Sequence, residues 1–140
     1  MSVIYYETNM TSNTLPKPYI ALASSEYNAS FSAWKAFRNV VDSFGWSSSS
    51  STGWLRIDFG EPRLVNFVDM YGRDNTQYAF QSPRDFIFQG SNDGITFIDL
   101  LNVTNEPSFF ASEKRTYRFD KSNKFRYFRI NITKSNGTIS

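Results

Sequence analysis

Apolar and polar side chains alternate along several short segments of the chain, and this period of two is typical of β-strands with one buried face. Leu55, Ile57 and Phe59 share one face of the first such segment. Because several short segments of this kind follow one another, the chain is expected to be an all-β sandwich or barrel. The expected strands span residues 54–59, 64–71, 86–88, 96–103, 115–119 and 125–132.

The segments around the expected strands carry turn, loop and helix signals. Residues 60–62 read Gly-Glu-Pro and are expected to break the chain after the first strand, while Asn-Asp-Gly at 92–94 is a tight-turn signature. Five consecutive serines at 47–51 indicate a loop. Residues 86–88 are apolar on both faces, which favours a central strand. Helical periodicity is confined to residues 30–37, one or two turns that need tertiary support.

Composition bounds the class of protein. A chain of 140 residues fits a single domain, expected to span 1–140 with a lead-in segment at 1–12. Lys and Arg total 15 and Asp and Glu total 13, so the net charge of +2 does not indicate a nucleic-acid binder. The sequence has 0 Cys and 0 His, which excludes disulfides, thiolate chemistry, His-ligated metals and Ser-His-Asp triads. No motif marks a pair of glycosidase carboxylates, so no enzymatic activity is expected.

Six short motifs occur in an order that resembles a known family. They are S-S-E-Y at 24–27, A-W-K-A-F at 33–37, G-W-L-R-I-D-F-G at 53–60, P-R-D-F at 83–86, G-S-N-D-G-I-T-F at 90–97 and F-R-Y-F-R-I at 125–130. Together they resemble the discoidin family, or coagulation factor V/VIII type C domains, most closely the bacterial and phage branch grouped with family 32 carbohydrate-binding modules. The resemblance implies an eight-stranded antiparallel jelly-roll β-sandwich of the galactose-binding-domain-like type. It also implies a ligand site built from loops at one end of the sandwich.

The loops that the family uses for its ligand contain the residue types that a sugar site needs. A sugar ring stacks its C–H groups on an aromatic face, and a few planar polar groups orient its hydroxyls. Arginine offers a rigid fork of donors, while carboxylates and amides accept. The predicted ligand-binding residues are Glu26, Tyr27, Phe44, Trp46, Arg73, Asn75 and Tyr78.

Each predicted contact has a structural alternative. Glu26 has the alternative of capping the short turn at 30–37, and Trp46 that of packing into the core beneath the serine loop. For Arg73 the alternative is a surface ion pair with a neighbouring aspartate. The basic residues interleaved with aromatics at 115–118 and 126–129 have the pattern of a single-strand nucleic-acid surface. Their alternating positions favour a solvated outer sheet face instead, so no nucleic-acid partner is expected.

Two departures from the family pattern concern a metal and the last strand. Relatives often bind a structural calcium ion after an A-F-D-G motif, but residues 36–39 read A-F-R-N. Arg38 places a cation where a carboxylate would stand, which opposes a calcium site, although Asn39 and Asp42 remain as metal ligands. No cofactor is therefore expected to be required. The family's final strand is expected to be missing or reduced after residue 137, with residues 3–6 or a neighbouring chain covering the open edge.

The leading prediction is a non-catalytic carbohydrate-binding module that recognises a cell-surface or cell-wall glycan. Its Asn- and Ser-rich, Cys-free composition is similar to that of phage-borne copies, which indicates an extracellular, multivalent adhesion assembly such as a phage tail or baseplate. The alternative is a structural or decoration module of a virion or surface assembly that makes protein–protein contacts. A membrane-lipid partner is disfavoured, because the hydrophobic residues at 44–46 are flanked by serine and few cations.

Overall fold

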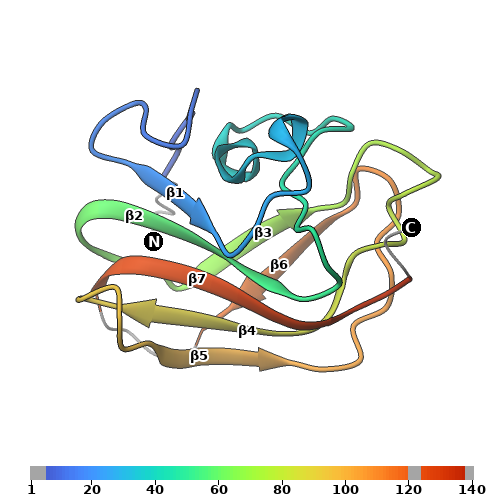
Figure 1. The fold of residues 1–140 in the computed structure, drawn as a ribbon. Coiled ribbons are helices and arrows are strands. Elements are labelled where there is room, and N and C mark those ends of the chain that lie inside the picture. The colour runs from blue at the N-terminus through green and yellow to red at the C-terminus, as the bar shows by residue number, and fades with distance from the viewer. Residues whose placement is uncertain (1–5, 120–123, 138–140) are drawn as a thin grey trace, which may run out of the picture.

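The computed structural model describes residues 6–119 and 124–137. Its strands pair in antiparallel fashion throughout this part of the chain, in a five-stranded sheet of order β1-β2-β7-β4-β5 and a two-stranded sheet of β3 and β6. Figure 1 shows β3 and β6 crossing behind the larger sheet. The predicted all-β sandwich is confirmed. The elements are β1 Ile20–Ala23, η1 Ala29–Phe31, η2 Ala33–Phe37, β2 Gly53–Leu64, β3 Phe67–Tyr71, β4 Pro83–Ser91, β5 Ile98–Val103, β6 Lys114–Arg118 and β7 Lys124–Ser135.

The core lies between the two sheets and is dominated by aromatic rings. Phe86 on β4 is 1% exposed, and its ring packs edge-on against Tyr117 of β6 with 5.5 Å between the centroids. Phe88, two residues further along β4, packs on the same Tyr117 ring at 5.5 Å. These side chains bridge the two sheets across the core and hold them together. The expected apolar face of β2 is buried in the same core, through Leu55, Ile57 and Phe59.

The expected break at residues 60–62 is wrong. Strand β2 continues through them to Leu64, with a register shift against β7 between Asp58 and Arg63. Gly60 has a φ of +79°, which lets the strand bulge without ending. Leu64 therefore belongs to β2, and the strand expected from residue 64 begins at Phe67.

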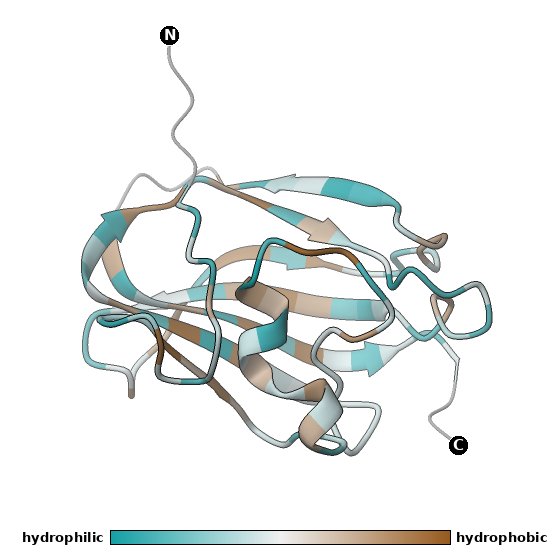
Figure 2. Ribbon diagram, turned by 90° about the horizontal axis from the view of Figure 1, so that it is seen from above, coloured by the Kyte–Doolittle hydropathy of each residue, from teal (hydrophilic) through white to brown (hydrophobic). Residues whose placement is uncertain are grey.

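Other expectations are confirmed or refined. Residues 86–88 lie in β4, which is paired on both sides by β7 and β5, as the apolar pattern predicts. The segment 30–37, which was expected to be helical, lies in two 3₁₀ helices, η1 and η2. Figures 1 and 2 show these helices beside β1. Strand β1 was not predicted, because its four residues are too few to show a period. The expectations for residues 3–5 and for a strand after 137 lie outside the described residues.

The topology gathers the long connections at one end of the sandwich. The connection from β1 to β2 spans 24–52, that from β3 to β4 spans 72–82, and that from β5 to β6 spans 104–113. Because the paired strands are antiparallel, the strand ends that these connections join lie together (Figure 1). The tight turn at 92–97 lies at the opposite end. No helix among the described residues is long and apolar enough to cross a lipid bilayer.

The substitution Phe86→Ala tests the role of the aromatic core. Removing a fully buried ring that joins the two sheets is expected to lower the free energy of unfolding by about 3–5 kcal/mol. Ile95→Ala removes a side chain that is 84% exposed and serves as the control, with an expected change of about 0.5 kcal/mol or less. Urea denaturation followed by tryptophan fluorescence measures both. Equal midpoints for the two variants would contradict this account of the core.

Candidate functional site

The three connections at one end of the sandwich are tied together by hydrogen bonds. The Asp74 amide donates to the carbonyl of Asp42 at 3.0 Å, and the Ser43 hydroxyl donates to the carbonyl of Asp74 at 3.0 Å. On the other side, the Ser112 amide donates to the carbonyl of Arg73 at 3.2 Å, and its hydroxyl donates to Asp74 Oδ1 at 3.0 Å. The 72–82 connection is thus held between the other two.

A continuous row of aromatic rings and one guanidinium lies across the first two connections. The Tyr27 ring meets Phe31 edge-on at 5.8 Å, and Phe31 meets Phe44 at 5.7 Å. The Arg73 guanidinium carbon lies 5.1 Å from the Phe31 centroid and 5.1 Å from the Tyr78 centroid. Tyr27 is 50% exposed and Phe44 is 47% exposed, so the row is open to solvent. We call Tyr27, Phe31, Phe44, Arg73 and Tyr78 the Arg73 surface.

Arg73 is fixed in this surface and keeps free donors. Its Nε and Nη2 both donate to the carbonyl of Ser43, at 3.2 and 3.0 Å. Nη1 has no hydrogen-bond partner among the described residues. Burial lowers the pKa of the guanidinium below its ordinary value, and Tyr78 opposes that shift. The group stays cationic at neutral pH, so it offers a held, partly desolvated donor to a ligand.

Local hydrogen bonds shape the first connection. The Asn28 side chain accepts from the Ser30 amide and caps η1. Glu26 Oε2 accepts from the Ala33 amide at 2.6 Å, so this carboxylate makes the capping contact that was the structural alternative. Lys35 Nζ lies 5.6 Å from the centroid of the Phe44 ring, which is a cation–π contact.

Trp46 and Asn75 also make internal contacts. Trp46 is half-buried against the core, and its indole N–H donates to the carbonyl of Ser25 at 3.0 Å. Asn75 Oδ1 accepts from the Gln77 amide at 2.9 Å and shapes the turn that carries Tyr78. The structure therefore brings four of the seven predicted residues together on the Arg73 surface: Tyr27, Phe44, Arg73 and Tyr78. Glu26, Trp46 and Asn75 support the loops from which those side chains project.

The geometry around Asp42 does not suit a calcium ion. Asp42 Oδ1 accepts from Arg38 Nη2 at 2.6 Å and from the Phe44 amide at 2.7 Å. A divalent cation bound to that oxygen would stand against the guanidinium. Within 6–119 and 124–137, no three carboxylates gather as metal ligands. Asn39 has a φ of +57° and lies in the exposed turn that follows η2.

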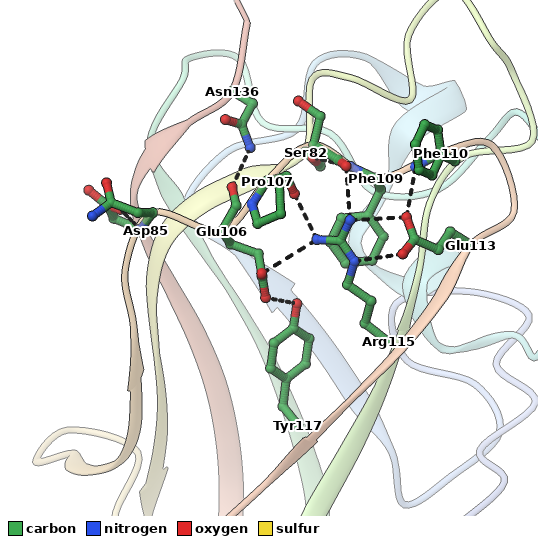
Figure 3. A network of polar contacts seen from close by, with 12 residues as sticks. Ser82, Asp85, Glu106, Pro107, Phe109, Phe110, Glu113, Arg115, Tyr117 and Asn136 are labelled. Carbon is green, nitrogen blue, oxygen red and sulfur yellow. Dashed lines mark hydrogen bonds and ion pairs between the residues drawn. The ribbon is translucent and has the colours of Figure 1, made fainter.

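The 104–113 connection is fastened by Arg115, as Figure 3 shows. Its guanidinium pairs with Glu113 at 2.8 Å and lies 4.0 Å above the Phe109 ring. It also donates to the carbonyls of Pro107 and Ser108, at 2.7 and 2.9 Å. Arg115 was expected on a solvated face. The structure corrects this expectation, because the loop folds back over the side chain.

Sequence reasoning did not include two residues of this end among the ligand contacts. Phe31 lies in the same loop as Tyr27 and is central to the Arg73 surface, because its ring contacts Phe44 and the Arg73 guanidinium. Phe110 is 78% exposed at the tip of the 104–113 connection, beside the buried Phe109. Two adjacent aromatics in a loop do not indicate which of them points outward.

The architecture defines the class of protein, a β-sandwich with the fold of family 32 carbohydrate-binding modules. Chitosan-binding module 1 of a chitosanase/glucanase from Paenibacillus sp. IK-5 has a TM-score of 0.72 and 19% identity, over 96% of this chain and 91% of that chain. Module 2 of that enzyme, in complex with chitotriose, has a TM-score of 0.70 and 17% identity, over 84% and 86%. The C. perfringens NanJ module, in complex with galactose, has a TM-score of 0.71 and 17% identity, over 86% and 85%.

The chain belongs to the F5/8 type C domain family, whose model matches residues 21–140. This match confirms the resemblance inferred from the six motifs. No curated protein sequence is detectably similar to the chain.

The substitution Gly72→Ala tests the packing of the 72–82 connection against the 104–113 connection. A methyl group at residue 72 would overlap the carbonyl oxygen of Phe110 and crowd Phe109 Cβ. The free energy of unfolding is expected to fall by about 1–3 kcal/mol. Gly45→Ala is the matched control, because a methyl group there meets nothing within 4 Å. Urea denaturation compares the two, and an unaffected Gly72→Ala variant would show that the connections are loosely packed.

Proposed function

We propose that this domain is a non-catalytic carbohydrate-binding module whose glycan ligand sits on the Arg73 surface. The observation that carries the proposal is the Arg73 guanidinium. It lies 5.1 Å from each of two aromatic rings, is fixed to the Ser43 carbonyl, and keeps Nη1 available beside exposed rings. This arrangement offers the aromatic face and the hydrogen-bond donor that binding of a sugar requires.

In the proposed binding mode the aromatic rings supply affinity and the hydrogen-bond donors fix the orientation of the sugar. The exposed faces of Phe44 and Tyr27 accept the C–H groups of a sugar ring, and burial of that apolar face supplies most of the affinity. The guanidinium donates to adjacent hydroxyl oxygens and fixes the orientation of the ring. Because the backbone of these loops is already tied together, little ordering is required on binding.

The comparisons support a glycan as the ligand class. The NanJ module is described in complex with galactose, and chitosan-binding module 2 in complex with chitotriose. Both share the sandwich fold of this chain, and neither description assigns them a catalytic reaction. A neutral or amino sugar is therefore the proposed ligand class here.

The proposal extends to the setting in which the module acts. A single shallow site with few donors binds weakly, so repeated copies on one assembly are needed for firm attachment. We place the module outside cells, on an adhesion assembly such as a phage tail or baseplate. The support for this setting is the Cys-free, Asn- and Ser-rich composition.

The substitution Arg73→Ala tests the proposed site. The wild-type domain, displayed multivalently, is applied to an array of β-galactosides, GalNAc-terminated glycans and glucosamine oligomers. Loss of a charged donor is expected to weaken binding about tenfold or more. Arg118→Ala is the matched control, since Arg118 also stacks on a ring, that of Phe67 at 5.4 Å, at the opposite end of the sandwich. Equal binding by both variants would place the site elsewhere.

A chelator tests whether calcium takes part. Asp42 is bonded to Arg38 and is therefore not free to bind a cation. Glycan binding and thermal stability are expected to be the same in about 1 mM EDTA as in a buffer that contains calcium. The array measurement and a thermal melt are made in both buffers. A melting temperature that rises with calcium would show that a metal binds despite this geometry.

A further inference from the structure

We propose that Phe110 is a second aromatic contact, which holds the sugar ring next to the one on the Arg73 surface. The ligand would then be an oligosaccharide of at least two rings. This inference rests on the proposed function and names the class of glycan more narrowly. It begins with a contrast between neighbours: Phe109 is 3% exposed in the core, whereas Phe110 is 78% exposed.

The loop that exposes Phe110 is held firmly. The Phe110 amide donates to Glu113 Oε1 at 2.9 Å, and its carbonyl accepts from the Glu113 amide at 3.1 Å. Arg115 clamps Glu113 from the other side, while the Phe109 amide donates to the Ser82 hydroxyl (Figure 3). An apolar ring on a mobile tip would lose entropy on binding a ligand. A ring on a fixed backbone loses less conformational entropy when it binds a ligand.

The same loop is joined to the Arg73 surface. Ser112, two residues after Phe110, donates to the Arg73 carbonyl and to Asp74 Oδ1. Gly72, the residue before Arg73, lies so close to the Phe110 carbonyl that no side chain fits there. The backbone of Phe110 is therefore a direct neighbour of the backbone that carries Arg73, and a glycan leaving the Arg73 surface on this side meets the Phe110 loop.

The surroundings of Phe110 favour a neutral ring over a lipid headgroup. No Lys or Arg stacks on the Phe110 ring in the described chain, although Phe31, Phe44, Phe67 and Phe109 each have such a contact. The carboxylates of Asp74 and Glu113 lie in the same loops, and the guanidinium of Arg115 beside them is paired with Glu113. A membrane contact needs cations around its hydrophobic tip to attract anionic lipids. A sugar ring needs only the aromatic face.

The test compares glycans of different length on the wild-type domain and on Phe110→Ala. Calorimetric titrations use glucosamine oligomers and β-galactosides of one to four rings, chosen by the array. Wild-type affinity is expected to rise about three- to tenfold from one ring to two or three rings. In Phe110→Ala that rise is lost while the affinity for the single sugar stays the same. Ile95→Ala removes a side chain of similar exposure at the opposite end and keeps the rise. Phe110→Trp, which retains an aromatic ring at this position, also keeps it.

The outcomes separate this inference from the proposed function. Phe110→Ala should melt at the wild-type temperature, because the ring is exposed and its backbone bonds are kept. If Arg73→Ala abolishes binding but Phe110→Ala keeps the full dependence on length, the proposed function stands and the second contact is wrong. An equal loss for single sugars and oligomers in Phe110→Ala would also overturn it, since the residue would then belong to the first ring's site. No binding of any glycan by the wild-type domain overturns both.

Discussion

The packing of Tyr117 is the constraint on which the rest of the molecule depends, because this one side chain joins the core to the loop end. Its ring packs on Phe86 and Phe88 and so fastens β6 to the five-stranded sheet. Its hydroxyl donates to Glu106 Oε2 at 2.5 Å, at the base of the 104–113 connection. Burial first, and then the Glu106 carboxylate, raise the pKa of Tyr117, so the hydroxyl stays a donor. The contacts of Arg115 in the 104–113 connection lie next to this hydrogen bond. The position of that connection therefore depends on the packing of the core.

Much of the fold was predictable from the sequence, and each misreading has a physical cause. Alternation found most strands of the two sheets, since a half-buried strand needs that pattern, but not the four-residue β1. The break expected at residues 60–62 came from the turn residues Gly-Glu-Pro, and it was wrong because a glycine with positive φ allows a bulge there. Alternation failed at Arg115, since it gives the face on which a side chain lies and not what folds over that face.

The candidate site was predictable in its residue types more than in its contacts. Aromatic and arginine side chains in the right loops identified Tyr27, Phe44, Arg73 and Tyr78, which the structure places on one surface. The capping contact of Glu26 was one of the alternatives that the sequence offered, and the bond from the Gln77 amide to Asn75 is a local turn contact. The bond from Trp46 to the Ser25 carbonyl has no sequence signal, because it joins two positions 21 residues apart. Phe31 was not among the seven predicted contacts. Its importance comes from Arg73, which lies 42 positions later in the sequence.

The division between supporting and outward-facing groups explains the character of the site. Asp42, Asp74 and Asn75 each use a side-chain oxygen to bond another part of the loops. On the Arg73 surface itself, the groups that face solvent are the rings of Tyr27, Phe44 and Tyr78 and the partly exposed guanidinium. Ring faces supply affinity with little directionality, whereas the guanidinium supplies direction at a single point. Under the proposed function, such a site would recognise the shape of a sugar ring and one pair of its hydroxyls, so stronger discrimination would have to come from a neighbouring ring or from a neighbouring copy of the domain.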